Sequence, residues 1–165
     1  MQHPYQIEQQ AHTEWCWAAV GASIKNYFSP DATMTQCQIA NLVLGVDDCC
    51  NNPFPVDRDT TATLQDVLDK LNALKNVALP LSPQDIFTQI VTNSLPVGCR
   101  IGWFGQNDNG HFVVICGCPV TASGEQWLDI ADPFYGNCTI PYDQFVHSYL
   151  NAGEWTNAFL VKQPQ

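Results

Sequence analysis

Cys16 is the residue of this chain that is best placed for nucleophilic chemistry. It lies between two tryptophans, where apolar residues begin to recur at the i, i+3, i+4 spacing of a helix with one buried face; they are Trp17, Val20, Gly21, Ile24, Tyr27 and Phe28. The first turn of a helix has free main-chain N–H groups and the positive end of the helix dipole, and both stabilise a thiolate over a thiol. The position therefore favours a reactive cysteine, although a free cysteine is more commonly an inert part of a hydrophobic core.

Gln10 is the candidate for a second catalytic function at the same helix end. It lies six positions before Cys16, so its side-chain amide can reach the start of the helix. Attack of a thiolate on a carbonyl produces an oxyanion, which needs hydrogen-bond donors. We expect the Gln10 amide and the main-chain N–H of Cys16 to supply them, with Gln9 as the alternative to Gln10.

Four histidines compete for the role of general base. A nucleophilic cysteine needs an imidazole that takes and returns a proton, and a further group that orients this imidazole. His3 and His12 precede the helix of Cys16, and His147 falls on an expected short helix, where a surface position is the simpler interpretation. His111 directly follows a glycine at the start of an apolar run, so it can face a cleft at the edge of a sheet. We predict His111 as the base.

Asp132 is the predicted partner of His111. The apolar runs on either side of residues 119–124 indicate two strands of a hairpin, and a loop centred on the middle of this segment places His111 opposite Asp132. Directly opposed residues have Cβ atoms about 4.5 to 5.5 Å apart, within reach of a hydrogen bond. The same register places Asp129 opposite Val114, roughly 10 Å further along the strand, and so excludes it. The alternative is an incidental polar pair at a strand end.

Helices are expected in the first part of the chain and strands in the second. The expected helices cover residues 16–28, 35–44, 64–74 with Thr60 or Thr61 as cap, 83–91 and 142–150, and the expected strands cover 97–104, 111–118, 125–131 and 155–162. This segregation is typical of an α+β protein. The approximate division is a helical lobe over residues 1–94 and a β-sheet lobe over residues 95–165.

Gln10, followed by Cys16-Trp17 at a helix start, resembles the papain-like cysteine peptidases. The run Trp-Cys-Trp-Ala-Ala is similar to the small bacterial branch typified by the AvrRpt2 effector proteases. Gly-His-Phe-Val-Val at His111 and Asp-Pro at Asp132 resemble the corresponding region of the same branch and of the bacteriocin-processing peptidases. The resemblance spans about residues 10–160. It differs from papain itself, which has Asn where this chain has Asp132.

The resemblance implies a papain-like α+β fold and a cysteine endopeptidase acting on a protein or peptide substrate. Cys16 would be the nucleophile, His111 the base, Asp132 its orienting group and Gln10 an oxyanion donor, with no cofactor. It also implies a secreted bacterial protease, effector or toxin. One alternative is a deamidase or an acyl or peptidyl transferase that uses the same residues. Another is a non-catalytic, disulfide-stabilised binding module with a structural Cys16.

Cys37, Cys49 and Cys50 lie close together in the sequence. They lack the C-x-x-C spacing and nearby histidine of a zinc site, so we expect a disulfide from Cys37 to Cys49 or Cys50. Eight cysteines are many for a reducing cytosol, which favours a secreted protein or one delivered into a target cell. The first ten residues, however, do not have the pattern of a signal peptide.

Composition limits the classes of partner. At 165 residues the chain is expected to form a single domain, and no stretch is long and apolar enough for a membrane span. Sixteen acidic and six basic residues give a formal charge of −10. Nucleic acids and anionic membranes would repel such a surface, so we expect neither as a partner. We expect a monomer.

Overall fold

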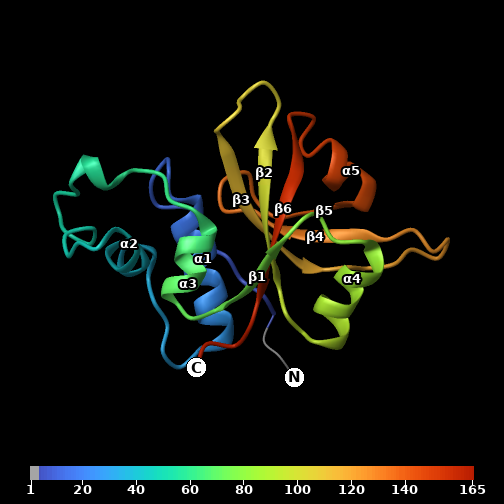
Figure 1. Cartoon of the computed structure of the whole chain (residues 1–165), viewed down its shortest axis with the longest axis horizontal. Helices are drawn as coiled ribbons and strands as arrows, with labels where there is room; N and C mark the ends of the chain where they lie inside the picture. The colour runs from blue at the N-terminus through green and yellow to red at the C-terminus, as the bar shows by residue number, and fades with distance from the viewer. Residues whose placement is uncertain (1–3) are drawn as a thin grey trace.

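One antiparallel sheet of six strands forms the centre of the molecule, with helices on both of its faces (Figure 1). The structure is a computed structural model that describes residues 4–165. The strands are β1 (Leu74–Ala78), β2 (Val97–Trp103), β3 (Gly110–Gly117), β4 (Trp127–Ala131), β5 (Cys138–Pro141) and β6 (Gly153–Val161), in the order β1-β6-β2-β3-β4-β5. The predicted α+β class is confirmed.

The helices divide into two groups, one on each face of the sheet (Figure 1). The first group is α1 (Cys16–Phe28), α2 (Gln36–Leu44) and α3 (Leu64–Lys70), with a 3₁₀ turn, η1 (Val56–Arg58), in the loop between α2 and α3. The second is α4 (Pro83–Phe87), which continues as a π-helical turn, η2 (Thr88–Thr92), together with α5 (Tyr142–His147). Within residues 4–165, no helix combines the length and the apolar character that crossing a membrane requires.

Strand β3 separates the two hydrophobic cores. Because successive side chains of a strand point to opposite faces, Phe112 and Val114 pack with α1 to α3, whereas Val113 and Ile115 pack with the α5 side. All four side chains are buried. The nearly continuous apolar run after His111 is therefore explained by a strand that is covered on both faces.

Helix α1 lies very close to α3 at Gly21. A Cβ atom at this position would lie 2.4 Å from Cγ1 of Val67 and 3.3 Å from Cγ2 of Ile39. The absence of a side chain is what lets the three helices approach one another. This contact fixes α1, and with it Cys16, against the rest of the helical group.

The region between α3 and β1 differs from the prediction. Helix α3 is capped by Thr63, whose hydroxyl accepts the N–H of Asp66 at 3.0 Å, and neither Thr60 nor Thr61 has that role. The helix does not reach residue 74, because the left-handed Asn72 (φ 53°) ends it and Leu74 starts β1. An asparagine in this conformation is a common helix stop.

The structural division also lies earlier than residue 94. Strand β1 pairs with β6, and Ile86 of α4 belongs to the hydrophobic core of the sheet and α5. The part of the chain that forms the sheet, together with α4 and α5, therefore begins near residue 74. Strand β5, which the sequence analysis did not predict, pairs with β4 at the edge of the sheet.

Candidate active site

Cys16 is the first residue of α1, as predicted. The N-cap residue is Trp15, which makes no side-chain capping bond, and the first turn contains no acidic residue. Side chains therefore leave the positive end of the helix dipole uncompensated at Cys16. Cys16 itself is only partly buried. Its position combines access for a substrate with a local preference for negative charge.

The two tryptophans that flank Cys16 attach the start of α1 to the loop before α3. The indole N–H of Trp15 donates to the carbonyl of Arg58 at 2.8 Å, and the indole N–H of Trp17 donates to the carbonyl of Thr60 at 2.9 Å. Both rings are buried. The direction of the helix end is therefore fixed on both sides of Cys16.

His111 and Asp132 are joined by a buried hydrogen bond. His111 Nε2 lies 2.8 Å from Asp132 Oδ1, and the two residues are only 6% and 3% exposed. The Cys16 side chain is near enough to the imidazole to raise the pKa of His111, and Nδ1 is the ring nitrogen that Asp132 does not use. Burial lowers the pKa of His111, but the bonds to Asp132 and Cys16 outweigh burial and raise it to about 9.

The strand register that predicted this contact was wrong by two residues. Val114 pairs with Ala131, and Asp129 pairs with Gly117 instead of Val114. The loop closes around residue 123, with a bridge between Val120 and Gln126, and the register shifts again after Ile115. A shift of two residues keeps side chains on the same face of a sheet. Asp132 therefore reaches His111 diagonally, from the position just after β4.

The carboxylate of Asp132 has hydrogen-bond donors on both oxygens. Besides His111, Oδ1 accepts the main-chain N–H groups of Phe134 at 2.8 Å and Tyr135 at 2.9 Å, and Oδ2 accepts the hydroxyl of Tyr149 at 2.5 Å. Burial would raise the pKa of Asp132, but the bond and charge of His111 and the bonds of Tyr149 and Tyr135 lower it. Sequence reasoning missed Tyr149, because no spacing rule connects it to Asp132.

Aromatic rings surround the imidazole of His111. Trp103 stacks on it with ring centroids 5.8 Å apart and planes 16° apart, while Tyr135 and Phe134 approach edge-on at 5.7 and 6.5 Å. A surface cavity of about 600 Å³ lies beside Trp103 and Tyr135. Apolar rings limit the access of water to the His111–Asp132 bond, which strengthens the electrostatic interaction between the two groups.

Gln10 lies next to this group of residues. Its main-chain N–H donates to the carbonyl of Pro133 at 2.8 Å, and its side-chain Nε2 donates to the carbonyls of His12 at 3.0 Å and Thr13 at 2.6 Å. Its Oε1 is buried without a hydrogen bond. Gln9, the alternative donor, is exposed. The role of Gln10 as an oxyanion donor stays a prediction.

Of the other histidines, neither His12 nor His147 joins the site as a base. His12 stacks on Phe54, with ring centroids 3.6 Å apart. His147 is exposed at the end of α5, which confirms its predicted surface position. His3 lies outside the described residues.

The cysteines other than Cys16 fall into two classes. Cys37 and Cys50 form a disulfide, which confirms one of the two predicted pairings, and Cys49 is a buried free thiol. Burial raises the pKa of each of the other free cysteines within residues 4–165, which are Cys49, Cys99, Cys116, Cys118 and Cys138. These thiols are therefore poor nucleophiles at neutral pH.

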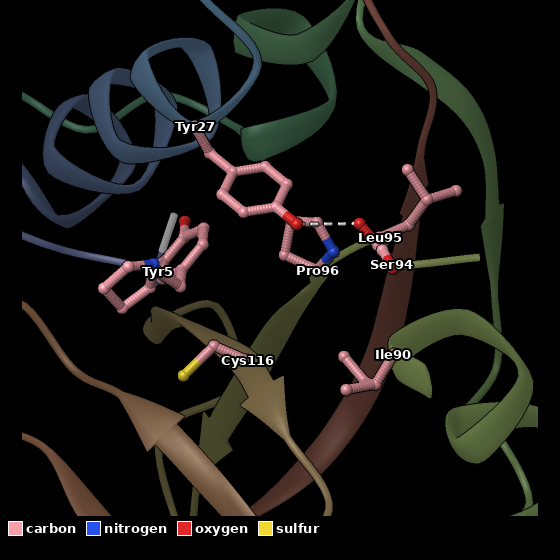
Figure 2. A pocket seen from close by; sticks show the side chains of 8 residues that line it. Tyr5, Tyr27, Ile90, Ser94, Leu95, Pro96 and Cys116 are labelled. Atoms are coloured by element: carbon pink, nitrogen blue, oxygen red, sulfur yellow. Dashed lines mark hydrogen bonds between the residues drawn. The ribbon is translucent and has the colours of Figure 1, made fainter. Parts of the chain in front are cut away.

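Cys116 illustrates this second class (Figure 2). It lines a cavity of about 190 Å³ together with Tyr5, Tyr27 and Pro96, and the hydroxyl of Tyr27 donates to the carbonyl of Ser94 there at 2.8 Å. Burial first, and then the negative charge of Asp129, raise the pKa of Cys116 to about 11. The cavity contains a protonated thiol without an imidazole among its lining residues.

Comparison with known proteins agrees with this geometry. The model of the family described as "Papain-like cysteine protease AvrRpt2" matches residues 1–149. The chain belongs to this family. The AvrRpt2-type chain is therefore a papain-like cysteine protease, which confirms the resemblance and the enzyme class inferred from the sequence.

No curated protein matches this AvrRpt2-family chain. Among solved structures, it is similar to the bromelain protease from Ananas comosus in complex with an inhibitor, with 11% sequence identity and a TM-score of 0.47. The match covers 94% of this chain and 92% of the bromelain chain.

Proposed function

We propose that this protease is an endopeptidase that cleaves a protein substrate through Cys16, His111 and Asp132. One observation carries the proposal: the His111 ring bonds Asp132 through Nε2 at 2.8 Å, and the Cys16 side chain at the start of α1 is near enough to raise the pKa of the same ring. Nucleophile, base and orienting carboxylate are then connected through a single imidazole, which is the arrangement that covalent catalysis needs.

The proposed reaction starts from a Cys16 thiolate and a protonated His111. The Cys16 thiolate attacks the carbonyl carbon of the scissile bond, and the π electrons of that carbonyl move to its oxygen. The His111 imidazolium then gives its proton to the leaving amine, and a thioester with Cys16 forms. Neutral His111 next takes a proton from water, whose oxygen attacks the thioester; the C–S bond then breaks, and the acid product and the Cys16 thiolate are released. The raised pKa of His111 supports an imidazolium as the starting state at neutral pH.

The oxyanion of each tetrahedral intermediate needs donors at the start of α1. The main-chain N–H of Cys16 is one proposed donor, and the positive end of the helix dipole favours the same charge. The amide of Gln10 is the second. For this role, one of its two N–H groups exchanges the carbonyl of His12 or Thr13 for the oxyanion.

Two surface cavities support a substrate that extends beyond the scissile bond. One adjoins Trp103 and Tyr135, and the other, of about 290 Å³, is lined by residues that include Gln10, His12 and Phe134. Room on this scale accommodates several residues of a polypeptide, which favours an endopeptidase over an enzyme for small amides.

We also propose that the enzyme acts as a monomer outside a reducing cytosol, as a secreted protease or as an effector or toxin delivered into a target cell. All proposed catalytic groups come from one chain, which supports a monomer. The Cys37–Cys50 disulfide supports an oxidising compartment for folding. Trapping of free thiols in the producing cells and in the medium tests this: a reduced, retained protein contradicts it.

The test of the proposed activity is profiling of new N-terminal peptides in a proteome treated with the wild type or with Cys16→Ala. Cys116→Ala is the matched control, because it removes a thiol that lies in another cavity. We expect new N-termini with the wild type and the control, and none with Cys16→Ala. A thiol-reactive epoxide should label Cys16 in the wild type.

The same experiment separates the alternative activities. Glutamine side chains converted to glutamate, without new N-termini, would replace the endopeptidase by a deamidase. Products joined to added amines would indicate a transferase. Equal products from wild type and Cys16→Ala would contradict the proposed nucleophile.

A further inference from the structure

Tyr149 is a buried tyrosine whose hydroxyl is directed at the proposed triad. It is 0% exposed, and its hydroxyl donates to Asp132 Oδ2 at 2.5 Å. We propose that Tyr149 is a positioning residue, which holds the Asp132 carboxylate so that Oδ1 stays aligned with His111 Nε2. This role rests on the proposed triad and adds to it a fourth residue that acts through Asp132.

The two oxygens of Asp132 have different tasks. Oδ1 accepts three N–H groups, from His111, Phe134 and Tyr135, whereas the bond from Tyr149 is the one found on Oδ2. A carboxylate group can rotate about its Cβ–Cγ bond and exchange its oxygens. With Tyr149 bonded to Oδ2, rotation breaks bonds on both oxygens. Without it, Oδ2 is a buried acceptor with no partner, and rotation becomes less costly.

Tyr149 is itself held by packing and by main-chain bonds. Its ring lies edge-on to Phe145, with centroids 5.5 Å apart, and is nearly parallel to Trp103 at 6.4 Å. Its main-chain N–H donates to the carbonyl of Gly153 at 2.8 Å, and its own carbonyl accepts the N–H groups of Ala152 and Gly153. The hydroxyl is therefore presented from a fixed ring.

Trp103 connects Tyr149 to His111 as well. The indole stacks on the imidazole and lies nearly parallel to the Tyr149 ring. Asp132 joins the same two residues through its two oxygens. The four side chains thus form a closed group, in which the position of each residue depends on the others.

Tyr149 acts as a neutral donor. Burial, followed by the negative charge of Asp132, raises the pKa of Tyr149 well above its ordinary value, so the phenol keeps its proton throughout the working range of the enzyme. Its bond lowers the pKa of Asp132 without adding a positive charge that would compete with the imidazolium of His111. It therefore stabilises the carboxylate in the form that His111 needs.

The experiment compares Tyr149→Phe with Tyr142→Phe. Tyr142 lies on α5, and its hydroxyl donates to the main-chain carbonyl of Leu81 at 3.0 Å, so the control removes a similar bond away from Asp132. With a cleavable peptide, we expect Tyr149→Phe to lower kcat about tenfold while KM changes less than about twofold. Tyr142→Phe should keep the wild-type kcat. Thermal unfolding of both variants reports any structural loss.

Two further readouts separate positioning from a merely structural role. Loss of the bond raises the pKa of Asp132, so the acid limb of kcat/KM should move to higher pH in Tyr149→Phe and stay in place in Tyr142→Phe. In an Asp132→Ala background, Tyr149→Phe should lower kcat by less than about twofold, because the group it positions is absent. An equal fold-loss in both backgrounds, or wild-type kcat in Tyr149→Phe, overturns the proposal.

The kinetics of the variants distinguish an error in the proposed triad from an error in the role of Tyr149. If Cys16→Ala and Asp132→Ala keep wild-type turnover, the proposed function fails, and the positioning role fails with it. If both lose turnover but Tyr149→Phe does not, the triad stands and only the role of Tyr149 is rejected.

Discussion

The main-chain N–H of Gln10 donates a hydrogen bond to the carbonyl of Pro133, with a distance of 2.8 Å between nitrogen and oxygen. Gln10 belongs to the segment that leads into α1, and Pro133 directly follows Asp132. One hydrogen bond therefore joins the segment before the nucleophile to the loop after the orienting carboxylate. The distance between the helical group and the sheet is fixed beside the proposed site, where it determines the approach of Cys16 to His111.

The substitution Asp132→Asn should retain much of the activity. An asparagine oxygen can accept the bonds that Oδ1 receives from His111 and from the main chain, so we expect kcat/KM within about tenfold of the wild type. Asp132→Ala removes the acceptor, and we expect a loss of about 100-fold or more. Steady-state kinetics on a peptide substrate measure both values.

Asp129→Ala is the matched control for this series. Its carboxylate accepts the hydroxyl of Thr139 at 2.6 Å, on the β5 side of β4. We therefore expect Asp129→Ala to lower the stability of the protein. Its turnover per folded molecule should equal that of the wild type. Equal kinetic losses at Asp129 and Asp132 would show that neither carboxylate acts through His111.

The raised pKa of His111 predicts the pH range of the enzyme. Burial lowers this pKa, but the bonds to Asp132 and Cys16 raise it from 6.5 to about 9. Since the imidazolium protonates the leaving amine, the alkaline limb of kcat/KM should have its midpoint near the same value. A midpoint close to the ordinary histidine value would contradict the proposed contacts.

The same pKa predicts how stability depends on pH. The folded value lies above the unfolded one, so the stabilisation is fully present below pH 6.5 and is lost as the pH rises through about 9. Asp132 has the opposite sign: its folded pKa is lowered, so its stabilisation is present above pH 3.8 and is lost as the pH falls through the folded value. The free energy of unfolding, measured with denaturant, should therefore differ between the wild type and His111→Gln below pH 6.5. This difference should become smaller as the pH rises through about 9.

Removal of the Cys37–Cys50 disulfide should destabilise the protein. The two cysteines are 13 positions apart, and closing a loop of about this length in the unfolded chain contributes about 3 kcal/mol in the chain-entropy model. We expect Cys37→Ala/Cys50→Ala to lose about that much free energy of unfolding. Asp48 of this loop holds Arg58 through an ion pair at 2.7 Å, and the carbonyl of Arg58 accepts the indole N–H of Trp15 beside Cys16, so kcat/KM should fall as well. Cys138→Ala, which removes a free thiol, should lose less than half as much stability.

Gly21→Ala should destabilise the helical group. Alanine is better than glycine in a helix interior by about 1 kcal/mol, so helix propensity alone predicts a gain. The new Cβ, however, would lie 2.4 Å from Cγ1 of Val67, and overpacking of this kind costs about 1 to 3 kcal/mol. We expect a net loss in denaturant unfolding. The double variant Gly21→Ala/Val67→Ala should lose less than the sum of the single variants, and strict additivity would contradict the clash.

The start of α1 and the His111–Asp132 contact could be predicted because they depend on local patterns. Apolar spacing after Cys16 identifies a helix, and the apolar run after His111 identifies a strand. The exact register could not be predicted, because a loop that closes around residue 123 and an irregularity after Ile115 are set by packing. The contact was still correct, since an error of two residues keeps both side chains on one face.

Other features lie beyond local patterns. Leu74 continues the helical spacing of α3, so only Asn72 signalled that the helix ends and a strand begins. Strand β5 has four residues and ends in Pro141, which is too short for a clear alternating pattern. Tyr149 meets Asp132 only because α5 and β6 fold back across the sheet, and no spacing in the sequence predicts that.

Strand β6 lies between β1 and β2, although all other strands precede it in the chain. During synthesis, the ribosome therefore releases the nucleophile, the base and the carboxylate before the strand that joins the two parts of the sheet. A chain that stops before residue 153 should be inactive and should lack a cooperative unfolding transition, since β1 has no neighbour on either side. We therefore expect the order of the strands to delay proteolytic activity until β6 has been translated.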